Sequence, residues 1–400
     1  MMKAHELMER PLPVASSRRE LMRLSLLTIG FAAAVGRGVP AAWFQEDEAV
    51  VPFTDVPATF TTRRTDRPEV HPGQSITAQD LRKLQSWITP MEDYFTVLHY
   101  NIPTIDPAAY RLTVGGLVAR PIALTLDQLK RRPKVARTVA FECGGNSRGR
   151  FHGMVGNATW AGAELRPLLE EAKPTSGARE TYFWGADTGQ ERIRNADYEQ
   201  NFARSLPLDE AVRANGLLAY EVNGAPLPVA HGFPVRLVVP GYYGVCNVKF
   251  LDRIELATER LMTRFMARDY VTLIGREVNG RTEWIEKSVT RMRVKSAIAR
   301  VTQRGSRFRV FGVAWTDGTP LKSIEVRIDG GAWQPAKIDR QDNPHAWAFW
   351  SSEATGLTAG EHSLVSRATD QQGRTQPDTL ETKKTVWENN ELFSRKVMVS

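Results

Sequence analysis

The 400-residue sequence predicts an α+β domain followed by an all-β, immunoglobulin-like sandwich. Strand and helix patterns mix irregularly over residues 79–288, whereas residues 289–385 carry strand patterns alone. The length agrees with this division, because 400 residues exceed one ordinary hydrophobic core and suit two domains. We assign residues 43–78 to an extended N-terminal arm over the first domain and residues 386–400 to a C-terminal tail.

Local signals place the elements of the first domain. Thr125 can cap a helix over 125–130, and Asn223-Gly224 suits a tight turn after a strand at 217–222. The further predicted segments are strands over 110–118, 138–141 and 235–239, and helices over 162–172 and 209–214.

Alternation and turn residues define the second domain. Residues 308–315 and 323–328 alternate in the manner of strands, and Asp329-Gly330-Gly331 is typical of a hairpin turn. Trp333, Trp347 and Trp350 are large enough to fill a sandwich core. These features predict an immunoglobulin-like sandwich.

The first 42 residues resemble a twin-arginine export signal. Arg18-Arg19 directly precede the apolar stretch 24–35, which is short for a membrane anchor. We therefore expect a periplasmic protein that is exported already folded. No later run is long and apolar enough to span a bilayer, so the exported part is not expected to cross a membrane.

The charge balance argues against nucleic acid as a partner. The net charge is +8, and the basic residues form no long run or stripe. A mild basic excess of this kind usually serves solubility.

The two cysteines, Cys143 and Cys246, are not expected to form a disulfide, because each lies in its own glycine-bounded loop. No Cys-x-x-Cys-His motif is present, so we expect no attached haem in this chain. Cys143 ends a buried strand in a Gly-Gly turn, and Arg148 can lower the pKa of its thiol. These features suit a soft-metal ligand, a nucleophile or a structural cysteine.

Several segments together resemble the sulfite oxidase family of molybdenum-cofactor oxidoreductases. Residues 138–148 are similar to its Cys-Ala/Gly-Gly-Asn signature with a nearby arginine. Residues 218–236 and 240–250 are similar to its cofactor-binding segment, and the shorter matches run in one order from about residue 80 to 385.

The resemblance implies a molybdenum held by a pterin dithiolene and one protein cysteine. It gives Cys143 the role of metal ligand and of catalytic residue, and it places Arg148 and Tyr270 beside the substrate. His231 and Arg236 would hold the phosphate end of the pterin. The remaining residues that it assigns to the cofactor pocket are Phe95, His99, Asn247, Val248 and Lys249.

The sequence also departs from the family's pattern at positions that matter for the substrate. Val97 stands where an arginine is expected, and Asn390 follows Trp387 where another is expected. Losing two charge-assisted contacts would weaken the binding of an anion, since each is worth about 1.5–3 kcal/mol.

Several functions remain open. The first is oxidation of sulfite or a related sulfur compound, with electrons passed to a separate carrier such as a c-type cytochrome. The alternative is an S- or N-oxide reductase on the same cofactor, which needs a neutral pocket. Two hypotheses come from other classes of protein: a metal-free hydrolase with Cys143 as nucleophile, and a non-catalytic binding module. The resemblance further implies a homodimer formed through the sandwich domain.

Overall fold

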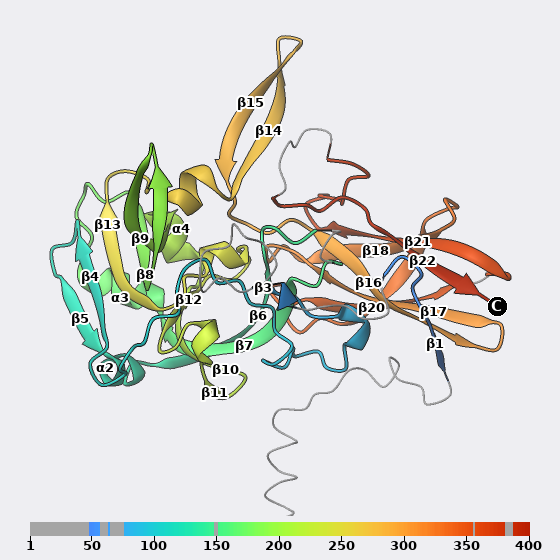
Figure 1. Cartoon of the computed structure of the whole chain (residues 1–400), viewed down its shortest axis with the longest axis horizontal. Helices are drawn as coiled ribbons and strands as arrows, with labels where there is room; N and C mark the ends of the chain where they lie inside the picture. Colours follow the sequence, from blue (N-terminus) through green and yellow to red (C-terminus); the bar gives the residue numbers. More distant parts are fainter. Residues whose placement is uncertain (1–47, 57–62, 65–75, 148–150, 355–356, 381–386) are drawn as a thin grey trace, which may run out of the picture.

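The computed structural model describes residues 48–56, 63–64, 76–147, 151–354, 357–380 and 387–400. The predicted export signal, most of the arm and Arg148 lie outside these ranges. Two β-rich parts lie side by side, the mixed domain and the sandwich (Figure 1). Among the described residues, no helix is both long and apolar enough to cross a membrane.

One sheet of the mixed domain leads directly into the cysteine loop. Its strand order is β11-β10-β7-β6, with β12 also paired to β10, and all these pairings are antiparallel. The strands are β6 (Lys134–Glu142), β7 (Val155–Glu164), β10 (Leu217–Val222), β11 (Ala225–Pro226) and β12 (Arg236–Val238).

The second sheet of this domain has the order β5-β4-β13-β8-β9. Only β4 and β13 run parallel; the other neighbours are antiparallel. Its strands are β4 (Arg111–Gly116), β5 (Ile122–Thr125), β8 (Glu180–Ile193), β9 (Ala196–Pro207) and β13 (Leu251–Ala257).

The helices in the described part of the chain are few and short. They are α2 (Leu126–Lys130), α3 (Leu165–Ala172) and α4 (Leu208–Arg213), with 3-10 turns at Leu81–Lys83, Val229–His231 and Gly244–Cys246 and a π-helical turn at Arg264–Arg268.

Thr125 and Gln128 form the capping box that starts α2, which confirms the predicted cap. The prediction of a helix from residue 162 was wrong at its start, because 162–164 end β7. A Cβ at Gly162 would lie 2.0 Å from the Leu218 carbonyl oxygen, so this close strand approach requires glycine.

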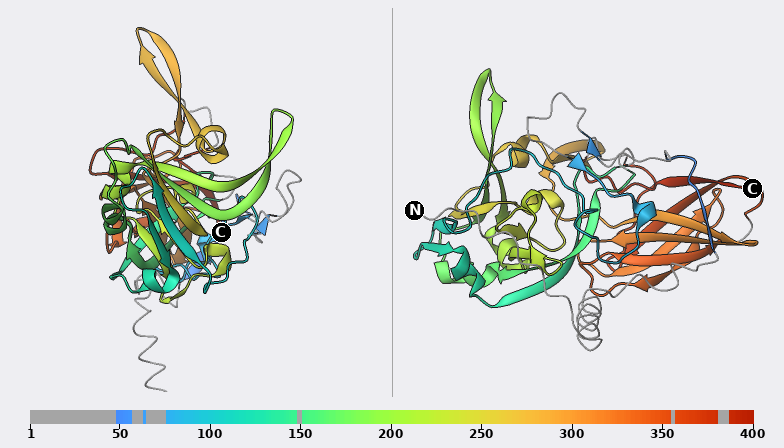
Figure 2. Two further views of the ribbon diagram at one scale, coloured as in Figure 1. Left: turned by 90° about the vertical axis from the view of Figure 1, so that its left-hand side faces the viewer. Right: turned by 60° about the horizontal axis from the view of Figure 1, so that its bottom comes forward.

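The second domain is an eight-stranded antiparallel sheet, in the order β1-β16-β17-β20-β19-β18-β21-β22, that folds into a sandwich (Figure 2). Its strands are β1 (Ala49–Val51), β16 (Lys295–Arg304), β17 (Arg307–Trp315), β18 (Leu321–Ile328), β19 (Gln334–Arg340), β20 (Ala348–Ala354), β21 (Gly360–Asp370) and β22 (Ser394–Val399).

Three sequence-based assignments in this domain were wrong. Residues 394–399 are not tail but strand β22, whose Val397 and Val399 are buried against β21. β1 of the N-terminal arm pairs with β16 of the sandwich instead of lying over the first domain. Trp333 is only half-buried, because its ring lies between the guanidinium groups of Arg327 and Arg367 at the surface.

The two domains share one hydrophobic core. Trp347 of the sandwich is fully buried, and its Nε1 donates a hydrogen bond of 2.9 Å to the carbonyl oxygen of Trp87. The cluster also includes Trp315 from β17 and Tyr270 from the first domain. The sandwich is therefore built against the region that holds the cysteine loop.

A two-stranded hairpin of β14 (Val271–Val278) and β15 (Arg281–Ser288) projects from the body of the molecule (Figure 1). It begins one residue after Tyr270, and the Val289 N–H donates to the Tyr270 carbonyl at its base. A second small ribbon pairs β2 (Arg63–Arg64) with β3 (Ile76–Thr77).

Candidate functional site

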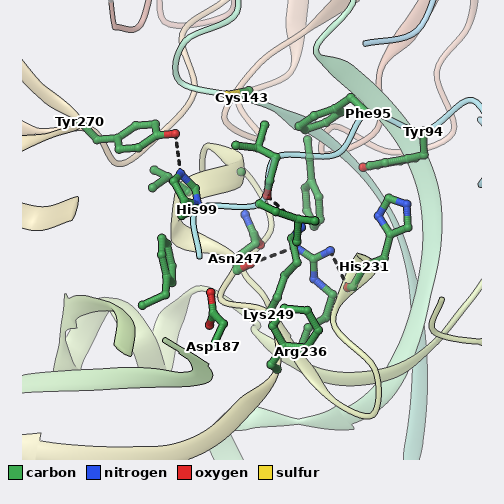
Figure 3. Close-up of a pocket in the computed structure, with 17 residues that line it drawn as sticks. Tyr94, Phe95, His99, Cys143, Asp187, His231, Arg236, Asn247, Lys249 and Tyr270 are labelled. Carbon is green, nitrogen blue, oxygen red and sulfur yellow. Dashed lines mark hydrogen bonds between the residues drawn. The ribbon is translucent and has the colours of Figure 1, made fainter. Parts of the chain in front are cut away.

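One pocket brings together residues that lie far apart in the sequence (Figure 3). The cavity between their side chains has a volume of about 50 Å³, and both polar and apolar side chains line it. Cys143, His99 and Tyr270 lie at one end, and His231, Arg236 and Lys249 line the other. Phe95 and Asn247, which the family resemblance assigns to the cofactor pocket, also line it.

Cys143 is held rigidly where β6 ends. Its N–H donates to the Met154 carbonyl at 2.9 Å, and its carbonyl accepts from the Asn146 N–H at 2.9 Å. The side chain of Asn146 closes the loop, donating to Glu142 and to the carbonyl of His152. Cys143 and Cys246 are both free thiols, which confirms that they do not pair. Cys143 thus lines the pocket from a loop that these hydrogen bonds hold.

His99 and Tyr270 form a hydrogen-bonded pair beside this sulfur. The His99 Nε2 lies 2.8 Å from the Tyr270 hydroxyl. Burial lowers the pKa of His99 to about 3, and Lys249, Arg264 and Arg204 add to the effect. Burial and the nearby Cys143 raise the pKa of Tyr270 well above 10. At neutral pH the pair is therefore an uncharged imidazole and a protonated phenol.

The other end of the pocket is cationic. Arg236 is 4% exposed, and its Nη atoms donate to the carbonyl oxygens of His231 and Asn247. Its Nε is buried and has no hydrogen-bond partner among the described residues. Burial lowers the pKa of Arg236 to about 10. The guanidinium also lies over the Trp160 ring, 4.7 Å from its centroid, and its hydrogen-bond acceptors among the described residues are neutral oxygens. A buried guanidinium without an anionic partner of this kind can receive an anion.

Lys249 adds a second positive group to this end. Its Nζ donates to the carbonyl oxygens of Val97 and Ala230, each at 2.9 Å. Burial, together with the charge of Arg236, lowers the pKa of Lys249 to about 7. An anion bound here would raise that pKa again and keep the ammonium charged.

His231 lies beside these two cations. Its Nε2 is 3.4 Å from the Thr96 hydroxyl, and burial, Lys249 and Arg236 lower its pKa to about 3. The imidazole is therefore neutral and can donate a hydrogen bond without adding charge.

Asn247 and Val248 support the pocket in other ways. The Asn247 side chain bonds to the backbone of Val239, Tyr242 and Tyr243, so it shapes the loop. Val248 is fully buried in the core and does not line the pocket, although its carbonyl accepts from the Leu237 N–H.

The two departures from the family pattern have different places in the fold. Val97 lines the pocket, whereas the Asn390 side chain donates to the Val294 carbonyl and is buried outside it. Cys246 lies behind the site, where its thiol donates to the carbonyl of Val289.

Sequence reasoning missed two residues at this site. Asp187 lines the pocket with its Oδ1 buried and without a partner among the described residues, and burial raises its pKa to about 7. Trp387 stacks on Tyr270 with ring centroids 4.1 Å apart. For Asp187, the sequence offered only a weak signal, which is a carboxylate directly after Gly185-Ala186 in a long strand. For Trp387 it offered no local signal, because this residue reaches the site from the other domain.

The donor set fits an anionic, elongated ligand with a soft metal at one end. Among the described residues that line the pocket, Cys143 alone contributes a sulfur atom. Within the described ranges, no group of three or more His, Cys, Asp and Glu side chains could hold a metal. A metal bound by Cys143 therefore needs further ligands from a small molecule, and the cations at the far end suit that molecule's phosphate.

Comparisons with known proteins agree with this geometry. The family described as oxidoreductase molybdopterin binding domain matches residues 99–265, and the Mo-co oxidoreductase dimerisation domain matches residues 285–399. The solved sulfane dehydrogenase SoxCD from Paracoccus pantotrophus superimposes with a TM-score of 0.71 at 26% identity, covering 85% of this chain and 91% of that one.

The curated relatives include sulfite oxidases and also a nitrate reductase of Oryza sativa, which is 30% identical over 361 residues and of which 38% is covered. The chain is 30% identical over 353 residues to sulfite oxidase of Gallus gallus, covering 78% of this chain and 75% of that protein. It is 31% identical over 330 residues to mitochondrial sulfite oxidase of Rattus norvegicus, covering 74% of this chain and 58% of that protein.

These findings define a molybdopterin-binding oxidoreductase. The chain belongs to the sulfite oxidase family of molybdenum-cofactor enzymes, as its sequence motifs predicted.

Proposed function

We propose that this protein oxidises sulfite or a related small sulfur compound and passes the electrons to a separate carrier such as a c-type cytochrome. A sulfur substrate is supported by the proteins to which this chain is similar, because they are named sulfite oxidases and a sulfane dehydrogenase. The observation that carries the proposal is the single pocket that joins the Cys143 sulfur to the basic end formed by Arg236 and Lys249.

The residues present fit the family's molybdenum–molybdopterin cofactor. Cys143 would bind the metal, and Arg236, Lys249 and His231 would bind the phosphate end. When bound, the cofactor supplies the oxo-transfer and two-electron chemistry that protein side chains lack. The unpartnered Nε of Arg236 would gain its missing acceptor.

The neutral His99–Tyr270 pair suits the substrate end of the pocket. A protonated Tyr270 can donate a hydrogen bond to an oxygen atom beside Cys143, and His99 holds the phenol in place at 2.8 Å. Phe202 stacks on His99 at 4.8 Å and excludes water from that face. Arg148, outside the described residues, would supply the positive charge that an oxyanion needs.

A second candidate is reduction of an S- or N-oxide on the same cofactor. Val97 favours it, because this apolar side chain lines the pocket where an anion-binding arginine is expected in sulfite-oxidising relatives. A neutral oxide would bind there without the cost of desolvating a charge.

The proposal also includes the oligomeric state and the cellular location of the protein. A dimerisation domain over residues 285–399 supports a homodimer formed through the sandwich. The paired arginines of the leader support export to the periplasm, which can be tested by changing Arg18 and Arg19 to lysine and locating the protein by cell fractionation.

Metal analysis and two activity assays test the function. The purified wild type should contain molybdenum and should reduce ferricyanide or cytochrome c when sulfite is added. Cys143→Ser should lose activity by about a hundredfold or more, because a metal ligand is changed. Cys246→Ser is the matched control and should keep its activity.

Two results would separate the alternatives. Oxidation of a reduced dye by an S- or N-oxide, without any sulfite activity, would favour the reductase. Absence of molybdenum together with rapid alkylation of Cys143 would overturn both and favour a cysteine nucleophile.

A further inference from the structure

The two glycines after Cys143 are each covered by an aromatic ring. A Cβ at Gly144 would lie 3.2 Å from the Tyr270 ring, and a Cβ at Gly145 would lie 3.1 Å from the Trp387 ring. The two rings stack on each other, with centroids 4.1 Å apart and planes at 26°. The metal-ligand loop is therefore packed closely against a pair of aromatic side chains, and a Cβ at either glycine would require the facing ring to shift by a few tenths of an ångström.

Trp387 is carried by a segment of the sandwich domain, residues 387–390, which we call the strap. The Glu388 N–H donates to the Gly144 carbonyl at 2.8 Å, so the strap is bonded to the cysteine loop itself. Lys295 donates to the Asn389 carbonyl at 2.7 Å and also to Glu142, the residue before Cys143. The backbone of Glu388 has a φ of +55°, a strained value that these contacts maintain.

Tyr270 needs such support. Its own φ is +56°, which side-chain-bearing residues rarely adopt, and it lies at the foot of a projecting two-stranded hairpin. Its hydroxyl nevertheless has to stay 2.8 Å from His99 and close to Cys143. His99 and Phe265 contact the Tyr270 ring, and Trp387 stacks on one of its faces, which limits the movement of the phenol.

We propose that Trp387 is a positioning residue, which fixes the Tyr270 phenol against His99 and covers the Cys143 loop. The sandwich domain would then complete the active site in addition to any role in dimerisation. The inference that Tyr270 contributes to turnover rests on the proposed function. The inference that Trp387 covers the cysteine loop does not.

The first test uses cofactor-free, full-length protein and needs no activity. Cys143 is 6% exposed and Cys246 is 1% exposed, so iodoacetamide should modify both slowly. In Trp387→Ala, alkylation of Cys143 followed by mass spectrometry should speed up by about tenfold, while Cys246 stays slow. Trp387→Phe keeps a ring and should stay within about twofold of the wild type. Trp333→Ala, a half-buried tryptophan elsewhere on the sandwich, is the matched control.

The second test uses the loaded enzyme. Trp387→Ala should keep its molybdenum and lower kcat by about tenfold with little change in KM, and Trp387→Phe should restore most of kcat. Unchanged alkylation and unchanged kcat in Trp387→Ala would overturn the proposal. An equal rise in the alkylation of Cys246 would also overturn it, because the effect would then be general loosening. If no variant, including the wild type, oxidises a sulfur compound, the proposed function fails and the alkylation result still decides the role of Trp387.

Discussion

The buried ion pair between Glu142 and Lys295 provides a sharp test of how the sandwich supports the cysteine loop. Both side chains are 1% exposed, and their charged atoms are 2.7 Å apart. Glu142 also accepts from Trp315 Nε1 at 2.8 Å, and Lys295 also donates to the carbonyl of Asn146. The pair therefore connects β6, β16 and β17 at the junction of the two domains.

Lys295→Met removes the cation and leaves the Glu142 carboxylate buried with only neutral donors. Removing one partner of a buried pair costs about 3–5 kcal/mol, because the remaining charge is uncompensated. At about 2–4 °C per kcal/mol for a domain of this size, we expect Tm to fall by about 6–20 °C. Combining Lys295→Met with Glu142→Gln should recover about half of the loss, since the orphaned charge disappears.

Urea and thermal unfolding of the four proteins in this cycle measure the effect. Arg276→Met breaks the exposed Arg276–Glu283 pair and serves as the control, with an expected change below about 1 kcal/mol. A Lys295→Met variant as stable as that control would refute the argument. So would a double variant whose loss equals the sum of the two single losses.

Three further predictions concern the pocket and the core. The pKa of His231 is about 3 when folded and 6.5 when exposed, so its contribution to stability is complete above pH 6.5 and is lost as pH falls toward 3. Between pH 7 and 5, the free energy of unfolding of the cofactor-free wild type should therefore fall by about 2 kcal/mol more than that of His231→Gln, as measured by urea unfolding. The same dependence of this free energy on pH in both proteins would contradict the prediction. Arg236→Gln should bind the cofactor with an affinity about ten- to a hundredfold lower, because a charge-assisted contact to phosphate disappears. Its molybdenum content after gel filtration, compared with that of the wild type, checks this. Gly162→Ala should destabilise by about 3 kcal/mol or more through its clash with the Leu218 carbonyl, while Gly115→Ala, which meets no atom within 4 Å, should change stability little; similar melting curves would show the clash is relieved elsewhere.

Local chemistry in the sequence determined much of this protein. The Thr125 cap, the Asn223-Gly224 turn and the strands β17 and β18 depend on neighbouring residues, and all are present in the structure, although β17 is buried on both faces from residue 310 onward. The motifs around Cys143 and residues 231–249 likewise identified the family and most of the pocket, because each motif keeps its own local geometry.

Features that depend on contacts between residues far apart in the sequence were decided only by the tertiary structure. No local pattern shows that 394–399 complete the sandwich as β22. Nor does one show that position 162 requires glycine because a Cβ there would lie 2.0 Å from the carbonyl oxygen of Leu218 in the neighbouring strand. Trp387 reaches Tyr270 from more than a hundred residues away, and Asp187 enters the pocket through the register of β8. The sequence states which side chains can bind a metal or an anion; packing between the two domains decides which of them face the same cavity.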